Sequence, residues 1–434
     1  MSVTFDAELY LRMAGERALL TSVPPGHWQP DGAITETAAA LVVADALDAE
    51  TAQTVVDEYS LARSIRGNGG GHVPRWPRHT GPMPAPVPMT PPRVVACNRD
   101  LDQSWGRLRV HSVVLGDRAT SVAFSAFESS PGALMQRMSA QGGLAAPQVS
   151  LTDDRGRTET AHVQGGGVMG GAGLGQGATF QGRLTTMSPL SRTTRWVELP
   201  EGRIELGDEC APQATVRVES LPPASPANRY LFRRLVGARQ GFFPGQFPGP
   251  PVSIEHAVAA LVAAGALAPD EPVIDTVRAI ASDKHPGTLA PGSLPSPWAS
   301  YLSRLGVQGG PDGAVAVAAV TPPIDGIIVA VDTLLSAGTG FGVHAATSPG
   351  TLFGPVPYDM SVKDPRVAWW AEDNLGNHYL GGSGGWGGGP DVTEGTVGFF
   401  PALDASATEL HLQPTLTTER AVITVRLPDW ETIT

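Results

Sequence analysis

Two pairs of adjacent carboxylates are the first residues of this chain that suggest chemistry. Asp153 and Asp154 precede a glycine in the first half of the sequence, and Glu372 and Asp373 take a similar place in the second half. Paired carboxylates can bind a metal ion or serve as general acid and base. Each pair also joins two expected strands through a glycine, which is the composition of a hairpin turn. We therefore expect turn residues at both places.

Two histidines, His162 and His378, follow the carboxylate pairs at what look like matching positions. Neither lies in an HxH, HExxH or CxxC pattern, so the spacing indicates no set of metal ligands. We expect both to be half-buried on strands, and we predict no metal site and no cofactor.

Two glycine-rich runs resemble phosphate-binding loops at first sight. Residues 165–170 satisfy GxGxxG, and residues 381–389 form the second run. A dinucleotide-binding loop needs its glycines between a strand and a helix, with the helix N-terminus facing the pyrophosphate. No helical pattern follows either run, and both lack the lysine of a phosphate-binding loop. Both runs are therefore expected to be flexible hairpin tips.

The nucleophile sequences SxxK, Asp-Thr-Gly and Asp-Ser-Gly are missing from the chain. Ser-His-Asp triads are recognised by geometry and not by spacing, so a site assembled in space stays open. We predict no catalytic residue, and the sequence leans against enzyme activity without deciding it.

Tryptophans are the first candidates for partner binding. Trp386 lies in the second glycine run, where its neighbours have no side chains to bury it. It either folds back over its own sheet or anchors a partner, because aromatic anchors dominate binding energetics. Trp369 and Trp370 are adjacent on an expected strand, so one ring should enter the core and the other should face outward or toward the other half. Trp386 and Trp370 are the predicted partner-binding aromatics.

A basic cluster near the start of the second half is the other candidate. Arg229, Arg233 and Arg234 lie close together in the sequence. They either receive an acidic partner surface or pair with carboxylates of the same chain. We include these three arginines among the predicted partner-binding residues.

The charge balance argues against nucleic acid as a partner. The chain has 42 acidic and 30 basic residues and a formal net charge of −12, which repels phosphate backbones and anionic lipid. A helical hairpin in the first half has the outline of a DNA-binding motif, but Asp57 and Glu58 lie where such a helix needs basic or amide side chains. We expect a protein partner or self-assembly.

The apolar segments favour a cytoplasmic protein without a membrane span. Residues 1–23 carry acidic side chains where a secretory signal needs an uninterrupted apolar core, and the longest apolar run, residues 257–268, is too short to cross a bilayer. Cys97 and Cys210 are expected to be free thiols in a reducing compartment, although a disulfide between them stays open.

The order of these features indicates that the second half of the sequence repeats the first, with a period of about 219 residues. Tyr10 returns as Tyr230, and the Ser-Pro-Gly turn at 130–132 returns at 348–350. Turns, apolar stretches and glycine runs keep the same order in both halves. We therefore predict a tandem duplication.

In the first part of each half, apolar residues recur at helical spacing. In the rest of each half, apolar and polar residues alternate as they do in strands. Expected helices span residues 7–20, 34–46, 49–65, 227–238, 254–266 and 273–281. Leu9 and Met13 suggest an apolar face that needs a partner, and Asp48 is placed to cap the helix that follows it. Pro- and Gly-rich connectors follow at residues 67–92 and 285–311.

Short strands are expected after each connector, because apolar residues alternate between turn residues. In the first half they span residues 93–97, 107–114, 121–127, 148–152, 158–163, 178–184, 194–199 and 214–219. In the second half they span residues 315–320, 327–333, 340–346, 366–371, 377–380, 396–399, 409–414 and 421–427.

The predicted fold is therefore α+β and β-dominated, with each copy built from a helical hairpin and an antiparallel immunoglobulin-like β-sandwich. The predicted divisions are 1–92 and 220–312 for the helices with their connectors, and 93–219 and 313–434 for the sandwiches. The predicted function is that of a non-catalytic structural, scaffold or interaction protein. The alternative is an enzyme or small-ligand-binding protein with a pocket between the copies.

Overall fold

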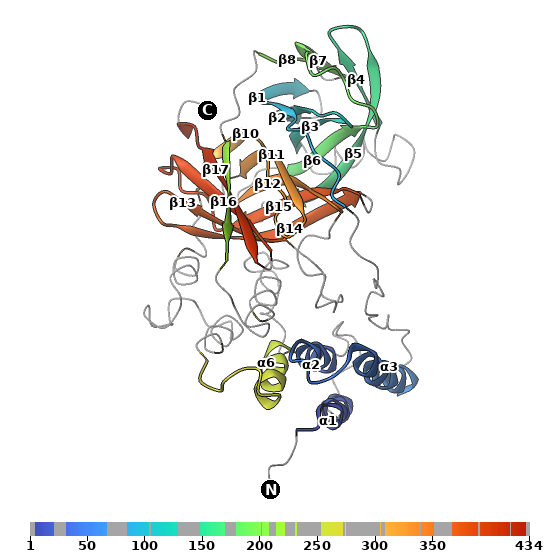
Figure 1. The fold of residues 1–434 in the computed structure, drawn as a ribbon. Coiled ribbons are helices and arrows are strands. Elements are labelled where there is room, and N and C mark those ends of the chain that lie inside the picture. Colours follow the sequence, from blue (N-terminus) through green and yellow to red (C-terminus); the bar gives the residue numbers. More distant parts are fainter. Residues whose placement is uncertain are drawn as a thin grey trace.

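The computed structural model consists of a helical layer and two antiparallel sheets (Figure 1). It describes residues 5–20, 32–66, 85–103, 106–128, 148–169, 179–200, 202–207, 214–221, 231, 253–271, 274, 304, 309–337, 340–350, 367–388, 391–416 and 418–430. The predicted helices at 227–238 and 273–281 lie almost entirely outside these residues, as does most of both connectors. A β-dominated α+β chain with few helices is confirmed.

Four helices form the described part of the helical layer: α1 (Ala7–Leu20), α2 (Gly32–Val43), α3 (Ala49–Arg66) and α6 (Ser253–Ala263). Aspartates begin two of them, because a carboxylate can accept hydrogen bonds from the free backbone N–H groups of the first turn. Asp6 Oδ1 accepts from the Leu9 N–H at 3.0 Å, and Asp48 Oδ1 accepts from the Thr51 N–H at 2.8 Å. The capping role predicted for Asp48 is confirmed.

Helices from opposite halves of the sequence, α2 and α6, pack against each other. Ala38 and Leu41 of α2 and Ala257 and Leu261 of α6 are fully buried in one apolar cluster. Small alanine side chains at such a contact let two helices approach closely while the leucines fill the remaining space. The cluster also includes Trp370 from the second sheet, so it links the helices to that sheet.

The first sheet has eight strands: β1 (Arg93–Gln103), β2 (Gly106–Leu115), β3 (Thr120–Glu128), β4 (Gln148–Asp153), β5 (Thr158–Met169), β6 (Thr179–Thr186), β7 (Trp196–Leu199) and β8 (Gly202–Glu205). Their order is β1-β2-β3-β6-β5-β4-β7-β8, and every neighbouring pair is antiparallel. Strands β1 and β8 approach each other, so the sheet is nearly a barrel. Its apolar face is buried inside, as Val122, Phe124 and Ala126 on alternate positions of β3 illustrate.

The second sheet has nine strands: β10 (Asp312–Val320), β11 (Ile328–Ala337), β12 (Phe341–Ser348), β13 (Ala368–Asp373), β14 (His378–Gly388), β15 (Thr393–Phe400), β16 (Glu409–Thr415), β17 (Glu419–Arg426) and β9 (Ala214–Ser220). The order is β10-β11-β12-β15-β14-β13-β16-β17-β9. Its first eight strands follow the same order as those of the first sheet. The ninth, β9, comes from the first half of the sequence and pairs with β17, so the predicted division at residue 219 falls within this strand.

Every strand predicted from alternation is present, and the short strand β8 is the addition. The immunoglobulin-like sandwich is not confirmed. Such a sandwich has two separate sheets in each unit, whereas each unit here has one continuous sheet that curls around its own core. Alternation identifies a strand with one buried face, and that face looks the same in a stacked sheet and in a curled one.

The expectation that the glycine-rich runs are hairpin tips is wrong for their described residues. Residues 165–169 lie in β5, and residues 381–388 lie in β14. Crowding explains one of these glycines, Gly381. A Cβ atom there would be 2.5 Å from the Trp369 Cβ, 2.9 Å from the Phe399 ring and 3.0 Å from a Val397 methyl carbon. The aromatic core of the second sheet therefore leaves room only for glycine at this position.

We expect Gly381→Ala to lower the free energy of unfolding by about 1–3 kcal/mol, because an added methyl group must displace packed core atoms. Gly398 on the neighbouring strand β15 is the matched control, since a Cβ there would meet nothing within 4 Å. Urea unfolding of both variants measures the difference. Equal midpoints for Gly381→Ala and Gly398→Ala would contradict the packing argument.

Candidate functional site

Among the residues that the structure describes, a group of polar side chains is buried where the two sheets meet, and we call it the junction. It is formed by β1, β2, β3 and β6 of the first sheet and by β10, β11 and β12 of the second. A bulge interrupts β2 between Val110 and Ser112, and a bulge interrupts β11 between Val331 and Thr333. Across the junction Ser112 Oγ and Thr333 Oγ1 lie 3.2 Å apart. The two bulges therefore place corresponding residues face to face.

The bulge residue of β11 is Asp332, and it forms the main ion pair of the junction. Arg183 of β6 lies 2.8 Å from Asp332 Oδ2, and each side chain is 13% exposed. His344 Nδ1 of β12 contacts the same oxygen at 2.8 Å. Burial alone would raise the pKa of the Asp332 carboxyl, but the charge of Arg183 and the contacts with His344 outweigh it and hold that pKa well below its ordinary value. Asp332 is therefore an ionised carboxylate at neutral pH.

The bulge residue of β2 is His111. Its environment disfavours the charged form of the side chain, whereas that of Asp332 favours it. Its Nε2 atom lies 2.7 Å from Ser125 Oγ on β3. Burial, with a smaller contribution from the charge of Arg109, lowers the pKa of His111 to about 4. Its Nδ1 atom is buried without a hydrogen-bond partner among the described residues. His111 is therefore a neutral imidazole at pH 7 with one nitrogen unsatisfied.

Asn98 of β1 adds a further link between the sheets. Its side-chain amide accepts from the Ala314 N–H at 2.8 Å and donates to the Ala314 carbonyl at 3.2 Å. Asn98 has φ of 45°, in the left-handed region that asparagine tolerates better than most residues. Nearby, Arg109 donates to Asp100 of its own sheet and to Asp312 of the other.

A serine beside a histidine is the minimal arrangement for nucleophilic catalysis. The pair of Ser125 and His111 does not meet the other requirements of that chemistry, since each residue is only 2% exposed. No acidic side chain among the described residues bonds to the His111 Nδ1. The contact joins strands β2 and β3 of the first sheet, and a nucleophilic serine would need to be exposed to its substrate.

Residues 381–385 also spell GxSxG, which marks the nucleophile of many hydrolases when it lies at a sharp turn from strand to helix. Here the backbone of all five residues belongs to β14, which continues to Gly388. The turn that this motif requires does not occur at these residues.

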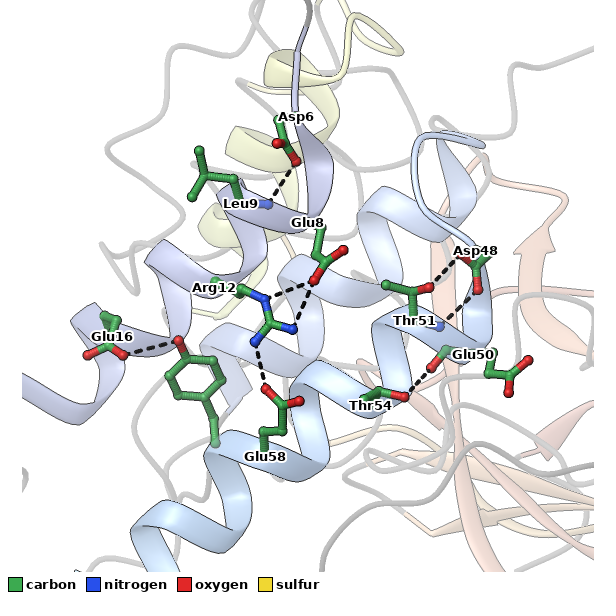
Figure 2. A network of polar contacts seen from close by, with 11 residues as sticks. Asp6, Glu8, Leu9, Arg12, Glu16, Asp48, Glu50, Thr51, Thr54 and Glu58 are labelled. Atoms are coloured by element: carbon green, nitrogen blue, oxygen red, sulfur yellow. Dashed lines mark hydrogen bonds and ion pairs between the residues drawn. The ribbon is translucent and has the colours of Figure 1, made fainter.

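The helices carry a second polar network, shown in Figure 2. Arg12 of α1 lies 2.9 Å from Glu8 and 2.6 Å from Glu58 of α3. Tyr59 of α3 donates its hydroxyl to Glu16 at 3.1 Å. These contacts hold α1 alongside α3.

The sequence-predicted binding residues are not brought together. Trp370 is 9% exposed and packs into the helical cluster, while the adjacent Trp369 is buried in the core of the second sheet, as their alternation predicted. The backbone of Trp386 lies in β14 opposite Gly395, and its side chain lies outside the description. The arginines at 229, 233 and 234 lie outside the described residues.

The carboxylate pairs lie at hairpin turns, as expected, where Asp153 and Asp373 end strands β4 and β13 and bond to the turn, while Glu372 lies within β13. Asp153 Oδ1 accepts from the backbone N–H groups of Arg155 and Arg157, and Asp373 Oδ1 does the same for Leu375 and Asn377. No group of side chains with metal-ligating spacing occurs among the described residues.

His162 and His378 are half-buried on strands, as predicted, but they do not match each other. His378 pairs with Glu372 immediately after its turn, whereas His162 pairs with Gln148 four residues further along its strand. Strand register depends on the number of residues between a side chain and the turn, and this number differs for the two histidines. Their match in the sequence rests on the glycine runs that follow them.

Comparisons with known proteins add one distant similarity. The chain is similar to the crystal structure of a conserved domain protein from Bacillus anthracis at 10% sequence identity, over 77% of this chain and 92% of that one, with a TM-score of 0.19. A score this low supports no inference about fold or function. No protein-family model and no curated protein sequence matches the chain.

Within the ranges that the structure describes, none of the helices combines the length and the apolar character needed to span a bilayer.

Cys97 is a free thiol, and burial raises its pKa to about 11, so it stays protonated at neutral pH.

Proposed function

We propose that this chain is a tandem duplication that acts as a non-catalytic scaffold or interaction protein. Two sheets with the same order of eight strands support the duplication. The bulges at His111 and Asp332 and the hairpins at Asp153 and Asp373 support it further, because each pair has the same local geometry in both sheets.

The observation that carries the scaffold function is the junction. Its ionised pair, Arg183 and Asp332, is buried and serves to hold one sheet against the other. A buried ion pair at this place suits a protein in which the relative position of the two units matters, because such a pair can fix geometry while adding little stability. Two fixed units can present several surfaces to partners at constant spacing. We propose a protein partner and a cytoplasmic location.

An affinity purification from native lysate, together with light scattering on the pure protein, tests this function. We expect either a co-purifying protein or a particle larger than one chain. Recovery of the bait alone, with the scattering mass of a single chain at all concentrations, would contradict the scaffold function.

A small-ligand-binding protein is the second candidate, and the buried His111 Nδ1 without a partner favours it. A ligand hydroxyl at the junction would satisfy that nitrogen. A thermal-shift screen of sugars, nucleotides and metal ions tests the idea, because a ligand that binds only the folded protein must raise the melting temperature. A flat screen counts against this candidate and leaves the scaffold function in place.

A further inference from the structure

His111 lies on the face of the first sheet that meets the second sheet. Val110 and Val113, which flank the bulge of β2, belong to the core of the first sheet, so the residues between them lie on the outer face. Ser112, the next residue after His111, contacts Thr333 of the second sheet. Strands β10 and β11 approach β2 here, and His111 is buried. Its imidazole is therefore part of the junction.

A proton on this imidazole would create a buried charge that lacks an acceptor. The Nε2 atom of His111 is bonded to the hydroxyl of Ser125, and the Nδ1 atom has no hydrogen-bond partner among the described residues. Both ring nitrogens of an imidazolium ion are donors. The Nδ1–H group would therefore stay unsatisfied for as long as the two sheets remain in contact, and a buried unsatisfied donor costs free energy.

The charged groups around His111 do not supply this acceptor. In both sheets together, the charged or titratable side chains that take part in the junction contacts are Arg109, Arg183, Asp100, Asp312, Asp332 and His344. Each carboxylate of this set is bonded to an arginine, and Asp332 also to His344. Asp100 favours an imidazolium at His111, but burial and the charge of Arg109 outweigh it.

The contacts across the junction are polar, whereas each sheet has an apolar core of its own. Among the described residues, the core of the first sheet lies within residues 95–206, and the core of the second lies within residues 214–216 and 315–430. Water replaces hydrogen bonds and ion pairs at a smaller net cost than it replaces apolar packing. Separation of the sheets therefore requires only the loss of the junction contacts, and neither core has to open.

We propose that the junction is a pH-sensitive contact, in which protonation of His111 releases the two sheets from each other while each sheet stays folded. This inference rests on the proposed function, because it adds a means of switching off the fixed spacing of the two units. A buried histidine can act in this way, because only the open form exposes the added charge to water.

The size of the effect follows from the affinity of His111 for a proton in the two forms. Its pKa is about 4 in the closed junction and should return to the ordinary value of about 6.5 once the sheets separate. The ratio of open to closed protein is therefore expected to rise by about 100-fold between neutral pH and pH 4. The same proton uptake favours opening before unfolding, since opening leaves both cores intact.

Small-angle X-ray scattering and far-UV circular dichroism of the full chain between pH 7 and pH 4 test the inference. On acidification we expect the radius of gyration to increase at constant scattering mass, while the dichroism of the strands is retained. His111→Gln keeps a polar side chain beside Ser125 but takes up no proton, so its radius should stay constant. His411→Gln is the matched control, because His411 lies on β16, outside the junction, and bonds to Glu409. This variant should expand like the unchanged protein.

A disulfide across the junction provides a second test. The double variant Ser112→Cys/Thr333→Cys places two thiols where the hydroxyl oxygens lie 3.2 Å apart, so that oxidation links the two sheets. The oxidised variant should keep its radius at pH 4, and the reduced variant should expand. An expansion of His111→Gln equal to that of the unchanged protein, an expansion of the oxidised variant, a loss of dichroism together with the expansion, or no expansion of the unchanged protein would each overturn the inference.

Failure of this inference is distinguishable from failure of the scaffold function. If a partner or a larger particle is found at pH 7 and the unchanged protein does not expand at pH 4, the pH-sensitive contact is overturned and the scaffold function stands. If the unchanged protein expands as expected and neither a partner nor a larger particle is found at pH 7, the pH-sensitive contact is supported and the scaffold function is contradicted.

Discussion

Replacing Arg183 with methionine is expected to lower the free energy of unfolding by about 3–5 kcal/mol, the largest effect of any single change considered for this chain. Methionine keeps much of the side-chain volume and removes the charge. Asp332 would then be a buried carboxylate whose remaining contact is His344. The cost comes from this uncompensated charge and not from a lost attraction alone. Urea or thermal unfolding at neutral pH measures it.

A surface ion pair provides the matched control for Arg183. Arg157 lies 2.7 Å from Glu159 but is 50% exposed, so Arg157→Met should cost less than about 1 kcal/mol. The double variant Arg183→Met/Asp332→Leu removes both charges and should be more stable than Arg183→Met. If Arg183→Met costs no more than Arg157→Met, the buried pair does not hold the two sheets together.

Acidification from pH 6.5 to pH 4 is expected to remove about 3 kcal/mol of stability through His111 alone. The unfolded chain binds a proton at this histidine below pH 6.5, whereas the folded chain keeps it neutral down to about pH 4. Each proton taken up only by the unfolded chain favours unfolding, so stability falls across this window and levels off below it. Below the ordinary pKa of an aspartate, Asp332 begins to add a second loss, because its carboxylate is favoured in the folded chain.

Urea unfolding at a series of pH values measures this dependence, and His111→Gln is the comparison. The variant cannot take up a proton at this position, so its stability should fall much less between pH 6.5 and pH 4, whatever its stability at pH 7. Parallel curves for the variant and the unchanged protein would show that another group causes the acid sensitivity.

The elements of this fold were predictable where one local signal decides them. Alternating apolar residues identified the strands of both sheets except β8, and the helix at residues 7–20 was predicted with the bounds that α1 has. The arrangement of these strands was not predictable. Whether eight strands stack as two sheets or curl into one depends on long-range pairing, and nothing in a single strand encodes which partner lies beside it.

The junction was missed for a related reason. His111 and Asp332 lie in strands whose residues are mostly apolar, and the alternation of apolar and polar residues gave no reason to single out either of them. One signal was present, because an aspartate within an apolar strand must find a partner if it is buried. The identity of that partner, Arg183, depends on the contact between the two sheets and cannot be read from spacing.

Strand β9 makes the two halves harder to separate than the predicted duplication implies. A fragment that starts at residue 220 would lack this strand, and the backbone N–H and C=O groups of β17 would lose their pairing with it. Open strand edges recruit other chains, so such a fragment is expected to aggregate even though it contains the whole of the predicted second copy. We therefore expect the second sheet to fold alone only if the cut precedes Ala214, so that β9 stays in the same fragment as β17.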